Sequence, residues 1–178
     1  MKKLLKFVPL CALLLAIVAF ILLLATNGLT YANEIGGQKV TGFYSASAVM
    51  FGQGKSQTAS GGIALTGDFD GKGAWNAVLA FVFLLIALVL LLISAITVFV
   101  KIKALEKFGG IIALAAGALL LVAGIFVFFT KGAFAAANDY GDMENWGLGA
   151  GWVVAAILAI LGGIVSACPA VLALVEKK

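Results

Sequence analysis

The chain has 178 residues, of which 63% are apolar and 11% are charged. A soluble domain is normally about half apolar and a quarter charged, so this composition indicates a membrane protein. The chain has no histidine, no arginine and two cysteines, which removes the commonest general base, the bidentate phosphate binder and any zinc or disulfide framework.

Four long segments without a charged residue predict four membrane-spanning helices. They cover residues 7–26, 75–100, 109–130 and 146–175. At a rise of 1.5 Å per residue, the shortest would reach about 30 Å, which is the thickness of the hydrocarbon layer. We therefore expect one membrane domain over residues 1–178, an all-α fold with a four-helix transmembrane bundle.

The first segment has an alternative interpretation as a secretory signal peptide. Lysines precede it, and Thr30-Tyr31-Ala32 resembles a weak cleavage site. Cleavage would leave three spans, and their orientation would not change.

The lysine distribution predicts that both termini are cytoplasmic. With the termini and residues 101–108 on one side of the membrane, that side carries eight lysines and two acids. The other side holds the external loops 29–74 and 131–145, with four lysines and six acids. Lysine-rich segments stay in the cytoplasm, so we expect a multi-pass protein of the cell membrane. The basic charge indicates topology, and we expect no nucleic-acid partner.

Small residues recur at fixed spacings in the predicted spans and let helix backbones approach closely in lipid. In the fourth span they form a stripe at Gly147, Gly151, Ala155, Ala159, Gly163 and Ala167. A seven-residue spacing occurs at Ala12, Ala19 and Thr26, at Ala80, Ala87 and Ser94, and at Gly110, Gly117 and Gly124. We expect the stripe to pack within the bundle, and an interface between chains is the alternative.

Polar groups inside the spans are few. Ser94, Thr97 and Ser166 are expected to bond to carbonyls of their own helices. No ionisable residue lies within a span, which disfavours a proton-coupled transporter. Cys11 and Cys168 lie near the predicted cytoplasmic ends, where a disulfide is disfavoured. We expect both cysteines to be buried, with S-acylation as the alternative.

The first external loop, 29–74, is too long for a turn and too apolar for a flexible linker. Residues 39–45, 46–51 and 63–66 have the composition of strands, and glycine-rich turns at 52–55 and 60–62 separate them. We expect a small extracellular antiparallel β-sheet over the helix ends. Its free edge is the expected contact surface, because an unpaired strand edge can accept another strand.

The acidic residues of the external loops suggest no metal site. Asp68 and Asp70 have calcium-loop spacing, but Lys72 replaces the third acid, so we expect a tight turn leading into the second span. Asp139, Asp142 and Glu144 are expected to interact with the N-terminal dipole of the fourth helix, with cation binding between the two loops as the alternative. The membrane-interface anchors are expected to be Trp75, Trp146 and Trp152.

This layout resembles that of the claudin-like tetraspan proteins, which have cytoplasmic termini, a long first external loop with strand character and a smaller second one. The first-loop signature of that family, Trp followed by Gly-Leu-Trp and two Cys, is absent from 29–74. Residues 145–149 repeat part of it in the second loop. The resemblance implies a layout and no functional residues.

These features favour a non-enzymatic membrane protein that acts as a structural, assembly or accessory subunit. Its partners would be the lipid bilayer and either further copies of itself or a larger complex. One alternative is a small transport or channel component whose pore forms between subunits. A second is a membrane enzyme using Asp68, Asp70, Asp139, Asp142 or Glu144. No nucleophile–base pair or phosphate-binding loop is readable, so we predict no catalytic residue, cofactor or metal.

Overall fold

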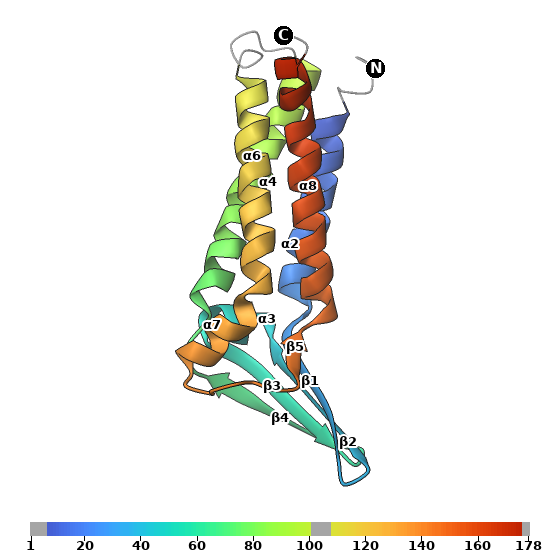
Figure 1. The fold of residues 1–178 in the computed structure, drawn as a ribbon, viewed down its shortest axis with the longest axis vertical. Helices are drawn as coiled ribbons and strands as arrows, with labels where there is room; N and C mark the ends of the chain where they lie inside the picture. Colours follow the sequence, from blue (N-terminus) through green and yellow to red (C-terminus); the bar gives the residue numbers. More distant parts are fainter. Residues whose placement is uncertain (1–6, 101–107, 176–178) are drawn as a thin grey trace.

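Four long apolar helices stand side by side, with a β-sheet at one end of the bundle (Figure 1). The structure is a computed structural model that describes residues 7–100 and 108–175. The bundle helices are α2 (Val8–Ala25), α4 (Trp75–Val100), α6 (Gly109–Phe128) and α8 (Ala150–Val175). Each is long and apolar enough to cross a membrane, so the structure has a long apolar helix in each of the four predicted segments. In Figure 1, α2 begins and α8 ends at the end of the bundle away from the sheet.

The interior of the bundle consists mainly of alanine, and large aliphatic side chains cover its outside. Ala16, Ala87 and Ala123 are fully buried, whereas Leu14 and Ile157 are exposed. A soluble bundle buries its large aliphatic residues instead. Helices in lipid associate through close packing, and their large side chains can face the acyl chains. The distribution of side chains therefore suggests a membrane-embedded protein.

The helices form a closed ring in which α8 packs between α2 and α6, and α4 contacts both α6 and α2. The seven-residue spacings predicted from the sequence lie mostly inside this ring. Their buried members are Ala12, Ala19, Ala80, Ala87, Ser94, Gly117 and Gly124. Two members differ, because Thr26 is half-buried at the end of α2 and Gly110 is exposed near the start of α6.

The predicted antiparallel sheet is present and is larger than the sequence indicated. Its strands run in the order β4-β3-β2-β1-β5, and all neighbours are antiparallel. They are β1 (Asn27–Ile35), β2 (Gln38–Ser45), β3 (Gln53–Ser60), β4 (Ile63–Asp70) and β5 (Trp146–Leu148). Paired glycines with positive φ, Gly36–Gly37 and Gly61–Gly62, connect β1 to β2 and β3 to β4, as two-residue hairpins require.

Residues 46–51 were predicted as a strand and form the short helix α3 (Ala46–Phe51) instead. The Ser45 hydroxyl accepts a hydrogen bond from the Ala48 N–H at 3.3 Å, which caps the first turn. Gly52 ends the helix in the left-handed conformation, with φ of 77°. The segment is apolar because one whole side of this helix is buried, so its composition resembled a strand. The predicted turn at 52–55 is also shorter, because β3 begins at Gln53.

The second external loop, 131–145, contains a helix that the sequence analysis did not predict, and the fourth long helix starts later than predicted. Helix α7 (Thr130–Ala137) follows α6, and Trp146 and Gly147 belong to β5 rather than to the helix. β5 pairs with β1, and the Gly149 N–H donates to the Gly28 carbonyl at 3.0 Å. This pairing holds the chain extended until Ala150, although the apolar run begins at Trp146.

Candidate functional site

Strand β4 forms the long free edge of the sheet. It has eight residues and ends the strand order on the side away from β5. All its residues except Phe69 are exposed, including Ile63 at 69% and Leu65 at 74%. Edge strands are normally protected by lysine, proline, short length or bulges. β4 contains neither lysine nor proline, so only Asp68 and Asp70 add charge along it.

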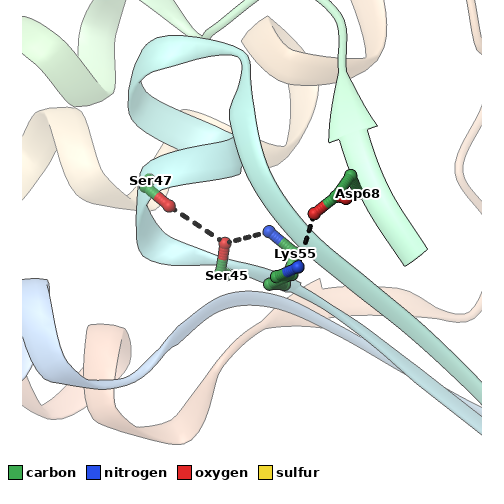
Figure 2. Close-up of polar contacts among 4 residues, drawn as sticks. All are labelled: Ser45, Ser47, Lys55 and Asp68. Carbon is green, nitrogen blue, oxygen red and sulfur yellow. Dashed lines mark hydrogen bonds and ion pairs between the residues drawn. The ribbon is translucent and has the colours of Figure 1, made fainter. Parts of the chain in front are cut away.

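A polar network joins β4 to the capped start of α3 (Figure 2). The Ser45 hydroxyl accepts a hydrogen bond from the Lys55 N–H at 3.0 Å and lies 3.2 Å from the Ser47 hydroxyl. The Lys55 ammonium group donates to Asp68 across the β3–β4 pair at 2.5 Å. A side chain at Gly54 would collide with this network, since its Cβ would lie 2.6 Å from the Ala48 nitrogen. The network connects β4 to α3 through Lys55, although the exposed ion pair itself contributes little stability.

The face of the sheet opposite the Lys55–Asp68 ion pair carries an aromatic cluster that α7 covers. Strand pairing places Tyr31, Tyr44, Phe69 and Trp146 on this face, which we call the aromatic face. Tyr44 is central, because its ring stacks on Trp146 at 4.9 Å and contacts Phe69 at 4.9 Å. Phe134 of α7 lies 5.1 Å from Tyr44. These aromatic contacts attach α7 to the sheet.

Tyr44 is also the residue whose environment changes its acidity most clearly. Burial, together with a hydrogen bond to the Tyr140 side chain, raises the pKa of Tyr44 to about 12 from the ordinary 10.0. The folded protein therefore keeps a proton on Tyr44 that the unfolded chain releases above pH 10.

We expect this Tyr44 pKa to make folding less stable at high pH. Stability falls with rising pH wherever the folded state binds more protons than the unfolded state. The contribution of Tyr44 is complete below pH 10 and is lost between pH 10 and about 12. Absorbance titration of tyrosinate in the wild type should show a component near pH 12 that Tyr44→Phe removes. An unchanged titration in the variant would contradict this assignment.

A cleft opens beside the aromatic cluster, where the second external loop crosses the sheet. It is open to solvent and has a volume of about 590 Å³, and its lining is Tyr44, Tyr140, Asp142, Met143, Glu144 and Trp146. The loop turns through residues with positive φ, at 56° for Asp139 and 63° for Asn145. Three aromatic rings and two carboxylates therefore surround one opening, which we call the aromatic–acidic cleft.

Asn138 ties the two external loops together at the end of α7. Its Oδ1 accepts a hydrogen bond from the Lys72 N–H at 2.9 Å, and its Nδ2 donates to the Lys72 carbonyl at 2.8 Å. Nδ2 also donates to the Phe134 carbonyl at 3.0 Å. The amide side chain thus binds the backbone of Lys72 as a neighbouring strand would.

We expect Asn138→Ala to lower the free energy of unfolding by about 1–3 kcal/mol, because backbone groups of both loops lose their partners. Thermal unfolding and faster amide exchange at Lys72 would measure the effect. Asn33→Ala is the matched control, since the Asn33 side chain accepts a local hydrogen bond from the adjacent Glu34 N–H. Equal melting temperatures of the two variants would show that Asn138 does not connect the loops.

The predicted packing stripe of the fourth span loses its first member, because Gly147 lies in β5 and α8 begins only at Ala150. Gly151 packs against the Thr26 side chain, so the stripe first faces the end of α2. Ala155, Ala159 and Gly163 are buried, and Ala167 is half-buried. A Cβ added at Gly163 would lie 2.7 Å from the Gly117 carbonyl oxygen. A Cβ added at Gly117 would lie 2.8 Å from the Gly163 carbonyl oxygen. Four residues turn a helix by about 400°, so the stripe drifts from α2 to α6.

The three tryptophans have three different environments. Trp75 begins α4 and is 63% exposed, which fits an interface anchor. Trp146 is half-buried within the aromatic cluster on the sheet. Trp152 is fully buried where α8 meets the sheet. The prediction that all three anchor the membrane interface is therefore wrong for Trp152, which packs against Gly28.

The structure also changes the expected roles of the loop acids. Helix α8 begins at Ala150 and has no acidic residue in its first turn, so Asp139, Asp142 and Glu144 do not lie at its N-terminus. Asp68 and Asp70 belong to β4, and residues 71–74 connect β4 to α4. Within residues 7–100 and 108–175, no group of three acidic or cysteine side chains is placed to hold a metal ion.

Polar residues inside the bundle behave less uniformly than predicted. Thr97 donates to the Ser94 carbonyl of its own helix at 2.7 Å, as expected. Ser166 instead donates across to the Ala113 carbonyl of α6, also at 2.7 Å. Cys11 and Cys168 are exposed on the outside of the bundle, so the prediction that they are buried is wrong. Both lie at helix positions that face away from the neighbouring helices.

Sequence reasoning missed Tyr44, Asn138 and Asn76. Asn76 is fully buried in α4 and donates from Nδ2 to the Phe126 carbonyl of α6 at 3.0 Å. The detectable signal for Asn76 was an amide inside an apolar segment, which requires a partner. Tyr44 and Asn138 carried no such signal, since tyrosine and asparagine are common in external loops.

No protein-family model matches the sequence, and no curated protein matches it.

Proposed function

We propose that this chain is a non-enzymatic membrane protein that assembles with other proteins through the free edge of β4. The partner strand comes either from a second copy or from another subunit of a larger complex. The observation that carries the proposal is an eight-residue edge strand with exposed Ile63 and Leu65 and no protective lysine or proline. An edge of this length presents unpaired backbone groups that an added strand satisfies.

The layout supports the same proposal. The sheet lies at the end of the bundle opposite the beginning of α2 and the end of α8 (Figure 1). With the lysine-rich segments in the cytoplasm, the sheet faces the outside of the cell. We also propose that the chain is a claudin-like tetraspan in layout, since two external loops build one sheet over four helices. The family signature in the first loop is absent, so no functional residue is transferred.

The proposal is tested by measuring particle mass after extraction of the full chain with its native lipid. We expect wild-type particles heavier than one chain, and Leu65→Lys particles reduced to one chain, because the new charges would face each other or enter an apolar contact. Ile35→Lys is the matched control, since Ile35, like Leu65, is an exposed aliphatic residue, but it lies on the β1–β2 hairpin, away from β4. Wild-type particles containing one chain alone, or equal loss of mass in both variants, would contradict the proposal.

A further inference from the structure

The aromatic–acidic cleft lies toward the β5 edge of the sheet, and its chemistry points to a function beyond strand pairing. Its rings come from β2, β5 and the second external loop, whereas β4 is the other edge. The volume of about 590 Å³ falls within the usual range for small-molecule sites. The cleft is therefore large enough for an organic group.

We propose that the aromatic–acidic cleft binds an alkylammonium group. The rings of Tyr44, Tyr140 and Trp146 line it, and the faces of tyrosine and tryptophan attract organic cations. Quaternary ammonium groups are recognised in this way by aromatic cages. Tyr44 stacks on Trp146 with an interplanar angle of 26°, so each ring covers one face of the other and both are held in place beside the opening.

The charge of the cleft favours the same class of ligand. Asp142 and Glu144 line it, and Asp142 also lines an adjoining opening together with Asp139 and Lys131. In the described part of the chain, the one ion pair joins Lys55 to Asp68 on the other face of the sheet. Neither Asp142 nor Glu144 forms an ion pair within the described part of the chain, so a bound ammonium group would supply a positive charge for them.

A metal ion fits this site less well than an organic cation. Calcium prefers six to eight oxygen ligands, and magnesium demands an octahedral set. Asp142 and Glu144 offer two carboxylates, and the rest of the lining is largely aromatic. The site is also held in place before binding, since Tyr44 contacts Phe69 and Phe134 as well as Trp146. A preformed aromatic surface reduces the ordering cost of binding.

The ammonium group has two sources with the same chemistry, a choline headgroup or a lysine side chain. Calorimetry on the full chain in maltoside micelles, which contain no ammonium group, can use choline chloride and N-acetyl-lysine methylamide as probes. We expect saturable binding of at least one probe, and the tighter probe identifies the source. The neutral isostere of choline, 3,3-dimethylbutan-1-ol, should not saturate the site, because it lacks the charge that the rings and carboxylates recognise.

Matched variants separate the cleft from general surface charge. Asp142→Asn combined with Glu144→Gln should weaken probe binding by about tenfold or more, and both residues are exposed, so the fold should persist. Glu34→Gln is the control, because Glu34 is an exposed acid on β1 outside the cleft lining. Absence of saturable binding by both probes, equal binding of the neutral isostere, or equal weakening by Glu34→Gln would overturn the proposal. None of these results depends on pairing at β4.

Discussion

Trp152→Ala should lower the free energy of unfolding by about 3–5 kcal/mol, the range for removing a buried aromatic side chain. Trp152 is fully buried at the junction between α8 and the sheet. A Cβ at Gly28 would lie 3.1 Å from the Trp152 ring, which shows how closely β1 approaches it. Alanine would leave a cavity where the sheet rests on the bundle, so both parts should loosen together.

Thermal unfolding of the full chain in micelles measures this effect. Trp152→Phe should cost less than alanine, because phenylalanine fills most of the volume and buries no indole N–H group. Trp75→Ala is the control within the same chain, since Trp75 is 63% exposed. Similar melting temperatures for Trp152→Ala and Trp75→Ala would mean that Trp152 does not join the sheet to the bundle.

Gly163→Leu should destabilise the bundle by on the order of 3 kcal/mol, the upper end of the usual cost of overpacking. A Cβ at Gly163 would lie 2.7 Å from the Gly117 carbonyl oxygen and 2.8 Å from the Leu121 side chain. Backbone atoms cannot move aside as a flexible side chain can, so α8 and α6 must separate. Because α6 belongs to the same chain, the loss should appear as a lower melting temperature of the single chain.

Leu161→Phe is the control for this variant, because Leu161 is exposed on α8. Melting temperature and particle mass should both be measured for the two variants. A Gly163→Leu protein with wild-type stability and a smaller particle would place the contact between chains. Wild-type values for both measurements would mean that the small-residue stripe has no packing role.

The sequence predicted the four long apolar helices well, because hydropathy depends on composition rather than on contacts with other segments. Helix boundaries were harder where tertiary pairing overrides the apolar run. Trp146–Leu148 is as apolar as the helix that follows it, yet pairing with β1 makes it a strand. The sheet was predicted from alternation and glycine turns, but β1 was missed because it directly continues the first apolar segment.

The candidate site could be predicted only in part, because its members come from distant segments. The free sheet edge was expected, but the register that assigns it to β4 depends on the β3–β4 pairing. The aromatic–acidic cleft joins Tyr44 to the loop of Asp142 and Glu144, about a hundred residues later. The hydrogen bond from Ser166 to Ala113 has the same origin, since only the bundle order brings α8 beside α6.

Photo-crosslinking in intact cells tests the proposed role of β4 most directly. A photoreactive phenylalanine analogue replaces Thr66, which is exposed near the middle of β4, and in a second protein it replaces Ile35 on the β1–β2 hairpin. Illumination should convert the Thr66 protein into a discrete species of higher mass, either a dimer or an adduct with one other protein. The Ile35 protein should stay at the mass of one chain. An uncrosslinked Thr66 protein, or the same adducts from both positions, would contradict assembly through the β4 edge.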